Sequence, residues 1–372
     1  MWKGIAGAAL AAACLLCGVP AAGAVGTTAS AAILMDAESG RVLYEYNAHE
    51  PRLIASTTKL MTALVALESG HSLDEVVTVA PEWVGIEGSS IYLQAGEKIT
   101  LKALLYGLLL QSGNDAAAAV AGYCGGTQER FVAMMSEKAR ELGMENSRFA
   151  NPSGLDADGH HASAYDMALL ARACLENETL AGMVSTRSIT LGTRTFTNHN
   201  KLLWRYEGCI GMKTGYTEAA GRTLVSAAER DGMTLICVTL SDPNDWADHA
   251  ALFDYGFSNF RREVLAEQGE ALCRVPVRNS LLSFCPAAAA ETVGLCLAPG
   301  EEAVRRLELE AAALTAPVSA GTQVGEAVWT VNGEEAARVP LVAAQDVDCH
   351  LLPRQGILDR LKERLEELSK SE

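Results

Sequence analysis

The sequence predicts a mixed α/β fold of the α+β kind: an antiparallel sheet flanked by helices, with an inserted helical subdomain, and a small C-terminal β domain. Strand patterns near 32–46 and again over 188–240 enclose a mostly helical stretch, 101–175. Strands from the two ends of this region therefore meet in one sheet, with helices packed around it. After about Arg262, short Val and Leu runs alternate with turn residues, which predicts a separate β module. The 372 residues suffice for one large core and a smaller one.

Residues 1–24 have the pattern of a secretory signal peptide. Lys3 supplies the positive start, residues 4–19 are apolar and rich in Ala, and small residues follow at the cleavage positions. The apolar run is short for a membrane span, so an uncleaved anchor is the weaker alternative. Lipidation at Cys14 or Cys17 is a second alternative, which the residues preceding them disfavour. We therefore expect a secreted, extracytoplasmic protein of the cell envelope.

Local patterns predict the first elements of the region 25–262. Apolar segments on either side of the turn 38–40 indicate a β-hairpin. An apolar helical pattern begins directly behind Ser56, and further helices follow from the helical spacing of apolar side chains. These helices are expected at 60–67, 101–110, 115–121, 128–142 and 163–175.

Strand patterns return after residue 188 and include a short candidate strand at 210–214. Two further strands, 223–227 and 234–240, flank an Asp-Gly pair that is typical of hairpin turns. A last helix is expected at 245–257. The region 25–262 is therefore predicted to form one large domain without internal repeats.

The remainder divides into two parts. Residues 263–350 are expected to form the small β domain, and 351–372 an amphipathic helix. The apolar stripe of that helix is narrow, and 356–372 hold four Lys/Arg against five Asp/Glu, so attraction to anionic lipid is weak. Weak membrane association of the tail is one hypothesis, and packing on a partner or on the protein itself is the other. The stripe consists of Ile357, Leu358, Leu361, Leu365 and Leu368.

The charge and the cysteines exclude several classes of function. A formal net charge of −16 disfavours nucleic acid as a partner. Neither a zinc-like Cys/His spacing nor any sign of a cofactor is present, so neither metal nor cofactor is expected. Eight cysteines remain after residue 24, and their pairing is open. Cys124, Cys174 and Cys237 are expected to be buried thiols, and the better bridge candidates are Cys273, Cys285, Cys296 and Cys349.

Three short motifs occur in the order Ser-x-x-Lys, Ser-x-Asn and Lys-Thr-Gly. Each is weak by itself, because a helix cap, a turn or a solvated lysine would explain it. Their combination and order carry the functional hypothesis. The motifs are Ser56-Thr57-Thr58-Lys59, Ser112-Gly113-Asn114 and Lys213-Thr214-Gly215.

The residue types suit nucleophilic catalysis. Ser56 and Lys59 are one helical turn apart, so their side chains share a face. A lysine in a desolvated, cation-rich pocket has a lowered pKa and can take the serine proton. The helix N-terminus can stabilise a developing oxyanion.

The other two motifs supply complementary groups. Ser112, expected on a loop between two helices, can relay a proton to a leaving amine, and Asn114 can orient Lys59 and bind a substrate amide. Lys213 and Thr214 offer a cation and a hydroxyl to a terminal carboxylate. The motif that holds them is expected to end an edge strand, where Gly215 lets a substrate backbone lie close as an added strand.

This set resembles the signature of the serine penicillin-binding proteins and β-lactamases. The flanking residues are more similar to the low-molecular-mass D-alanyl-D-alanine carboxypeptidases of peptidase family S11. The resemblance is strong over residues 30–260 and weaker over 263–345, the C-terminal β domain of that family. The flanks are 54–62, 112–116, 151–155, 198–203 and 211–217.

The resemblance implies a penicillin-binding transpeptidase-like fold and a carboxypeptidase that removes the terminal D-alanine from peptidoglycan pentapeptides. Its partners would be a stem peptide ending in D-Ala-D-Ala and β-lactam antibiotics as covalent inhibitors. Ser56 would be acylated, Lys59 its base, with Ser112, Asn114 and Lys213 completing the proton and electrostatic network.

The same resemblance assigns the rest of the site. The backbone N–H groups of Ser56 and Tyr216 would form the oxyanion hole, and Thr214 would hold the terminal carboxylate. Thr217 would lie with the substrate-binding strand. His161 would line the cleft, or, as an equal alternative, lie in a surface loop. Cys209-Ile210 departs from the family pattern and leaves the local shape of that strand open.

Other functions fit the sequence less well. A β-lactamase needs a carboxylate that activates water, and no Glu-x-x-Leu-Asn segment occurs between residues 140 and 180. A transpeptidase or endopeptidase of the same fold is the closer rival, and a non-catalytic binder of wall peptides is a third alternative. The sequence leaves open the preferred peptide, a vegetative or sporulation role, and the oligomeric state.

Overall fold

The computed structural model describes residues 25–350 and Lys362. The predicted signal peptide and nearly all of the predicted C-terminal helix lie outside the described residues. Among the described residues, no helix combines the length and apolar character that crossing a bilayer requires.

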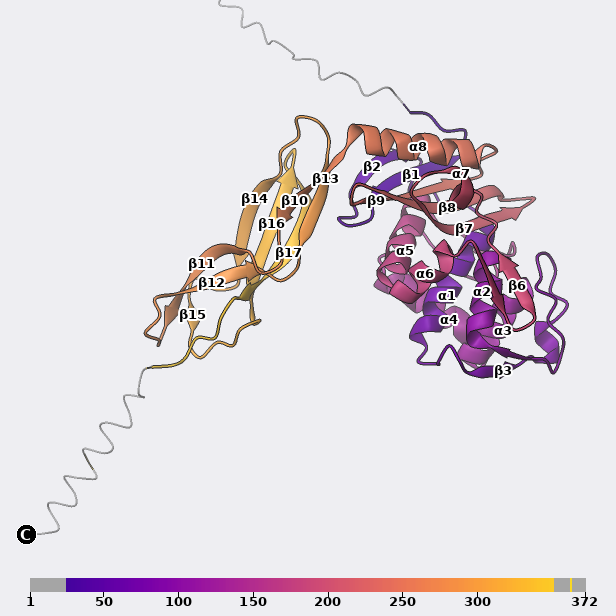
Figure 1. The fold of residues 1–372 in the computed structure, drawn as a ribbon, viewed down its shortest axis with the longest axis horizontal. Helices are drawn as coiled ribbons and strands as arrows, with labels where there is room; N and C mark the ends of the chain where they lie inside the picture. Colours follow the sequence, from indigo (N-terminus) through magenta and orange to yellow (C-terminus); the bar gives the residue numbers. More distant parts are fainter. Residues whose placement is uncertain (1–24, 351–361, 363–372) are drawn as a thin grey trace, which may run out of the picture.

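A five-stranded antiparallel sheet forms the centre of the larger domain (Figure 1). Its strand order is β2-β1-β9-β8-β7, so strands from the two ends of the region meet as the sequence predicts. Ile33 of β1 lies opposite Val238 of β9, and β7 is an edge strand. The strands are β1 (Ala31–Asp36), β2 (Val42–Tyr46), β7 (Cys209–Thr217), β8 (Gly221–Arg230) and β9 (Met233–Leu240).

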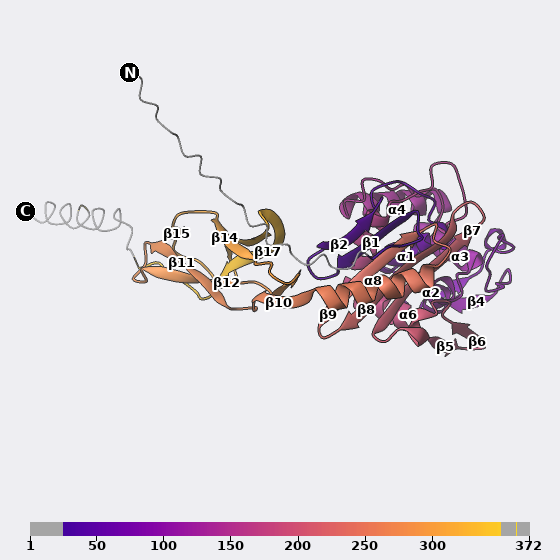
Figure 2. The same ribbon diagram turned by 90° about the horizontal axis from the view of Figure 1, so that it is seen from above.

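Helices cover both faces of this sheet (Figures 1 and 2). Ile33 and Met35 of β1 join the core with the helical subdomain, whereas Leu34 packs with Phe253 of α8 on the opposite face. The alternation of side chains along a strand explains why β1 is buried on both sides. The helices are α1 (Lys59–Glu68), α2 (Leu101–Leu110), α3 (Asn114–Gly125), α4 (Gln128–Glu141), α5 (Ala164–Glu176), α6 (Glu178–Ser185), α7 (Leu202–Arg205) and α8 (Asp245–Asn259).

Helix α1 lies inside the helical subdomain. Every residue from Lys59 to Ala66 is buried, so the helix is enclosed on all sides. A 3₁₀ turn, η1 (Ala55–Thr58), precedes it and holds Ser56. Short elements at the periphery are η2 (Pro81–Trp83), β3 (Val76–Thr78), β4 (Lys98–Thr100), β5 (Ser188–Leu191) and β6 (Arg194–Thr197).

The second domain is built from strands alone. Six of them form a sheet in the order β14-β16-β17-β12-β11-β15, and β10 pairs with β13. Val275, Trp329 and Leu341 belong to its core. The strands are β10 (Arg261–Ala266), β11 (Ala271–Arg278), β12 (Phe284–Ala289), β13 (Val293–Leu297), β14 (Val304–Leu309), β15 (Leu314–Thr315), β16 (Gln323–Val331) and β17 (Glu334–Ala343).

Two arginine–glutamate ion pairs join the two domains. The guanidinium of Arg41 contacts both carboxylate oxygens of Glu301 at 2.7 and 2.8 Å. Arg262 binds Glu38 in the same bidentate way. Cys296 of β13 packs in the core on the α8 face of the sheet, so the contact also has an apolar part.

The expectation of disulfides among the late cysteines is wrong for three of the four candidates. Cys273, Cys285 and Cys296 are free thiols. Cys273 lies opposite Ala287 and Cys285 opposite Val275, so the first two are out of register for a bridge across β11 and β12. Cys296 belongs to a different core. Of the thiols expected to be buried, Cys174 and Cys237 are buried and Cys124 is partly exposed.

Candidate active site

The three motifs meet at one cavity of about 280 Å³. Ser56 comes from η1, Ser112 from the turn between α2 and α3, and Thr214 from edge strand β7. Lys59, Asn114 and Lys213 lie buried next to these residues. The cavity is lined by Ser56, Ser89, Ser112, His199, Lys201, Thr214, Gly215, Tyr216, Arg222, Asp245 and Trp246.

The backbone before Ser56 is held in an uncommon conformation. Ala55 has φ +47°, a region that residues with a Cβ rarely adopt. Its carbonyl accepts a hydrogen bond from Thr58 Oγ1 at 2.8 Å, and the Ile54 carbonyl accepts from Thr57 Oγ1 at 2.6 Å and from Thr223 Oγ1 at 3.0 Å. These bonds fix the turn and present Ser56 to the cavity.

Three oxygen atoms surround the amine of Lys59. Its Nζ lies 2.8 Å from Ser56 Oγ, 2.8 Å from Asn114 Oδ1 and 2.5 Å from the carbonyl of Ser153. The amide of Asn114 is oriented by its Nδ2, which donates to the carbonyl of Glu87. Two of the three neighbours are therefore carbonyl oxygens, which can only accept. In the charged form the amine donates to all three oxygens, Ser56 Oγ included. In the neutral form the two carbonyl oxygens accept both N–H bonds, which leaves the lone pair for the Ser56 hydroxyl.

The environment of Lys59 favours that neutral form. Burial, and then the positive charge of Lys213, hold the pKa of Lys59 well below its ordinary value, although Asp115 acts in the opposite direction. Burial also lowers the pKa of Lys213 to about 7. The site thus contains two buried lysines, of which Lys59 is the one in contact with the nucleophile.

The turn between α2 and α3 is tightly packed. Ser112 has φ +59°, and a Cβ on Gly113 would lie 3.0 Å from Ile91 Cγ2. Asp115 accepts hydrogen bonds from Ser90 Oγ and from the backbone N–H groups of Ile91 and Leu93. Its carboxylate therefore ties the loop that contains Ser89 to the helix that begins at Asn114.

Strand β7 approaches the nucleophile closely. A Cβ on Gly215 would lie 2.4 Å from Thr223 Oγ1 and 2.9 Å from the backbone N of Ser56. The glycine is thus needed for packing within the protein, a reason that differs from the expected approach of substrate. Lys213 Nζ donates to the carbonyl of Thr214 at 2.8 Å. The motif also lies inside β7, which continues to Thr217, and not at its end.

The departure at Cys209-Ile210 corresponds to a β-bulge. Cys209 lies opposite Ala228 and Gly211 opposite Ala227, so Ile210 is the extra residue. Asn200 Nδ2 donates to the Gly211 carbonyl at 2.9 Å and supports the strand beyond the bulge. The local shape of β7 is thereby set before the Lys-Thr-Gly residues begin.

Two predicted residues are not brought to the cavity. Thr217 lies at the end of β7, where its hydroxyl donates to Asp156 Oδ1 at 3.0 Å. His161 does not line the cavity, and its backbone pairs with Arg148. Neither residue has a contact to Ser56 among the described interactions.

The neighbouring His160 contacts the nucleophile turn instead. Its Nδ1 accepts from the Ala150 N–H at 3.0 Å, so Nε2 carries the proton and donates to Thr58 Oγ1 at 2.8 Å. Burial lowers the pKa of His160 to about 4, which keeps the ring neutral. The sequence reasoning missed this residue, because an adjacent histidine pair does not reveal which ring points inward.

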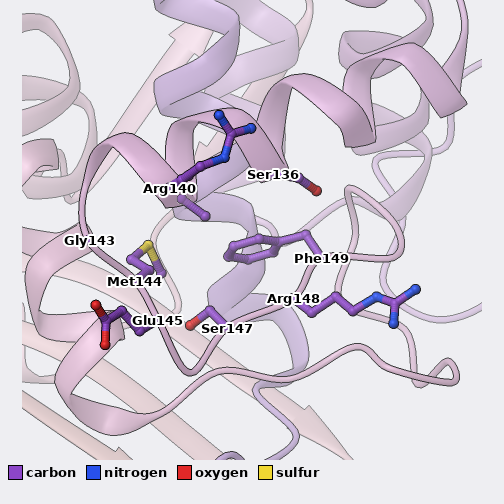
Figure 3. Close-up of a pocket in the computed structure, with 9 residues that line it drawn as sticks. Ser136, Arg140, Gly143, Met144, Glu145, Ser147, Arg148 and Phe149 are labelled. Carbon is purple, nitrogen blue, oxygen red and sulfur yellow. The ribbon is translucent and has the colours of Figure 1, made fainter.

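The segment that follows Phe149 contacts Lys59 through a backbone carbonyl. Figure 3 shows the Phe149 ring at the centre of a second cavity of about 300 Å³, with Met144 and Arg148 on either side. Further along the segment, the Ser153 carbonyl accepts a hydrogen bond from Lys59 Nζ. The Pro152 carbonyl accepts one from Thr62 Oγ1 at 2.7 Å. The Asn-Pro-Ser-Gly sequence therefore contributes a backbone group that the motif analysis did not assign.

Several cavity residues were not anticipated either. Arg222 donates to both oxygens of Asp245 at 2.8 Å, and its guanidinium lies 5.5 Å from the centre of the Trp246 ring. Asp245 is the sole carboxylate among the residues that line this described cavity, and it is paired. No signal in the sequence links these residues to the motifs, because Arg222 and Asp245 meet only in the folded chain. Within residues 25–350, no cluster of His, Cys, Asp and Glu has a metal-binding arrangement.

Comparison with known proteins agrees with this geometry. A family model described as D-alanyl-D-alanine carboxypeptidase matches residues 19–244, and one described as penicillin-binding protein 5, C-terminal domain, matches 260–348. D-alanyl-D-alanine carboxypeptidase DacF of Bacillus subtilis (strain 168) is 33% identical over 333 residues, which cover 86% of each chain.

Solved structures show the same likeness. Penicillin binding protein 5 from Haemophilus influenzae matches with a TM-score of 0.76 and 29% identity, over 87% of this chain and 98% of the other. A mutant DD-transpeptidase from Streptomyces matches with a TM-score of 0.60 and 32% identity, over 63% of this chain and 99% of the other. These similarities confirm the fold class expected from the sequence.

Proposed function

The chain belongs to the D-alanyl-D-alanine carboxypeptidase family of serine peptidases, and from this premise we propose that it removes the terminal D-alanine from peptidoglycan pentapeptides through an acyl-enzyme on Ser56. One observation carries the proposal above the others: the buried amine of Lys59 has two carbonyl acceptors and the Ser56 hydroxyl as its three neighbours. A neutral amine in that position is a general base aimed at one oxygen atom.

The proposed acylation step uses the side chains of Ser56, Lys59 and Ser112 and two backbone N–H groups. Lys59 takes the Ser56 proton as Oγ attacks the carbonyl carbon of the penultimate D-alanine. The backbone N–H groups of Ser56 and Tyr216 stabilise the oxyanion. The intermediate collapses to an ester on Ser56, the C–N bond breaks, and the proton passes from Lys59 through Ser112 to the amine of the departing D-alanine. Water, deprotonated by Lys59, then cleaves the ester and frees Ser56.

The terminal carboxylate fixes the substrate in this reaction. Thr214 and the positive charge of Lys213 bind it on strand β7, and the peptide lies along that edge strand. The same carboxylate is present in β-lactam antibiotics, so we propose that they acylate Ser56 and remain bound. Among the residues that line the cavity, the one carboxylate, Asp245, is paired with Arg222, so a carboxylate of the β-lactamase kind is not available there to activate water.

The setting of the reaction follows from the same proposal. Its substrate lies outside the cytoplasm, so residues 1–24 serve for export and are removed. We propose that 25–262 form the catalytic domain and 263–350 the β domain, with the boundary inside β10, which begins at Arg261. The tail, 351–372, is proposed to associate weakly with the membrane, and a chain lacking it should then bind lipid vesicles less than the intact chain in a sedimentation assay.

A direct experiment tests the proposed reaction. The protein is incubated with a pentapeptide ending in D-Ala-D-Ala, and free D-alanine is measured; a peptide ending in D-Ala-L-Ala is the matched control. We expect release from the first peptide alone. A longer cross-linked product would instead indicate a transpeptidase, and cleavage of an existing cross-link an endopeptidase. Penicillin should add its own mass to the protein, on the proteolytic fragment that contains Ser56; an adduct elsewhere would contradict the mechanism.

The pH dependence of kcat/KM should report the two buried lysines. The base must be neutral, so activity is lost as the pH falls and Lys59 becomes protonated. Lys213 must be charged, and its pKa of about 7 in the free enzyme means that this charge is lost as the pH rises through 7. We therefore expect kcat/KM for the pentapeptide to decline above about pH 7. A substrate with a C-terminal carboxamide should show no such decline, and an identical alkaline limb for both substrates would refute the role of Lys213.

A further inference from the structure

The β11–β12 hairpin ends in an exposed apolar loop. Leu281, Leu282 and Phe284 are 80%, 41% and 51% exposed. The loop is ordered by local bonds: the Val277 N–H donates to the Ser283 carbonyl at 3.0 Å, and the Leu282 N–H to Ser280 Oγ at 3.2 Å. Three adjacent exposed apolar side chains on an ordered hairpin indicate an interaction surface.

Strand register places two arginines around the aromatic ring. Phe284 lies opposite Pro276 in the antiparallel pair, so Arg274 and Arg278 are its diagonal neighbours on the same face of the hairpin. All three side chains on that face of β11 are exposed. Neither arginine has a hydrogen-bond or ion-pair partner for its guanidinium within residues 25–350. The face therefore presents one aromatic ring between two arginines whose guanidinium groups have no partner among the described residues.

The local charge contrasts with that of the whole chain. Residues 271–290 contain two arginines and no acidic residue, although the chain as a whole has a net charge of −16. Most of the surface therefore repels an anionic partner, and this hairpin attracts one. The segment that ends beside the hairpin at His350 contains two acidic residues, Asp346 and Asp348.

The hairpin also lies where the chain leaves the β domain. The His350 N–H donates to the Asn279 carbonyl at 3.0 Å, so the last described residues before the tail end beside the apolar loop. Figures 1 and 2 show this end of the β domain facing away from the catalytic domain.

We propose that the β11–β12 hairpin is a membrane-contact site, at which Leu281, Leu282 and Phe284 enter the interface of a lipid bilayer while Arg274 and Arg278 bind its anionic headgroups. Exposed Leu and Phe beside cations are the composition of an interfacial contact. Each arginine near an anionic leaflet adds electrostatic attraction, and its apolar stem can remain against the hairpin while the guanidinium reaches the headgroups. This contact is separate from the proposed membrane association of the tail, residues 351–372, and from the active site.

Vesicle sedimentation tests the proposal with residues 25–372, because the apolar residues 1–24 would bind lipid by themselves. The vesicles contain equal parts of phosphatidylglycerol and phosphatidylcholine. We expect the triple variant L281S/L282S/F284S to lower the partition coefficient at least about tenfold. The matched control V304S/L307S/L309S removes three exposed apolar side chains from β14 of the same domain and should bind as the unaltered chain does.

A second variant separates the two parts of the contact. R274Q/R278Q should weaken binding to the anionic vesicles and leave binding to pure phosphatidylcholine unchanged. The proposal is overturned if the hairpin variant binds like the unaltered chain, or if both triple variants lose binding equally. It is also overturned if deleting 351–372 abolishes binding while the hairpin is intact, or if the hairpin variant changes self-association and not lipid binding. D-alanine release from a soluble peptide should stay unchanged in every variant, which keeps this test apart from that of the proposed function.

Discussion

The variant Lys59→Arg should acylate with penicillin roughly 10³-fold more slowly than the unaltered protein, a loss of about 4 kcal/mol in transition-state stabilisation. Arginine is positively charged at any accessible pH and can still donate to Asn114 and Ser153. It cannot lose a proton at any accessible pH, so no lone pair faces Ser56. The expected result follows from the base function alone. It is measured as the second-order rate of adduct formation by mass spectrometry, with the thermal midpoint as a check on folding.

The matched control is Lys213→Arg at the second buried lysine. Lys213 is proposed to act through its charge, which arginine supplies, so acylation should fall by no more than about tenfold. Raising the pH should not restore Lys59→Arg, because a guanidinium stays protonated. If both variants acylated equally well, Lys59 would act by charge, and the lone-pair geometry described above would have no catalytic meaning.

The sequence could identify the reacting groups because each motif is local. Ser56 and Lys59 are one turn apart wherever the turn lies, and the order of the three motifs limits which strands and helices can hold them. The meeting of β1 with β9 was likewise predictable, since apolar strand patterns flanked a helical region. The structure brings Ser56, Lys59, Ser112 and Asn114 together, and the charge of Lys213 acts on Lys59.

Groups that meet only in the folded chain could not be predicted. The Ser153 carbonyl carries no side-chain signature, yet it fixes the proton arrangement on Lys59. His160 and His161 are adjacent in sequence, and only the direction of the loop decides that His160 reaches Thr58. Arg222 and Asp245 come from a strand and a helix whose approach depends on the whole sheet.

The cysteines show a case in which the sequence led to a wrong prediction. Clustering along the chain made a disulfide reasonable, but a bridge depends on cross-strand register. Cys273 and Cys285 lie on paired strands two positions out of register, so their proximity in sequence was misleading. Contacts between residues within one helical turn can therefore be predicted from the sequence. Contacts across strands depend on the strand register, which the sequence does not reveal.

The variant Gly154→Ala should lower the free energy of unfolding of the catalytic domain by about 3–5 kcal/mol and reduce acylation with it. Gly154 has φ +87°, and an added Cβ would lie 1.9 Å from the Ala55 carbonyl oxygen and 2.9 Å from Thr58 Oγ1. The oxygen cannot yield cheaply, because it is backbone and accepts the Thr58 hydroxyl. Relief of the clash must shift the turn that holds Ser56, so stability and reactivity should fall together.

A matched glycine separates the clash from the backbone conformation. Gly126 has φ +76° and no atom within 4 Å of an added Cβ, so Gly126→Ala carries the cost of the left-handed conformation alone, about 1 kcal/mol. Urea unfolding followed by tryptophan fluorescence compares the two midpoints, and penicillin acylation of the folded fraction compares reactivity. Gly126→Ala should acylate normally. Equal losses of stability in the two variants would mean that the contact between Gly154 and Ala55 does not hold the nucleophile turn, because only the shared backbone conformation would then contribute.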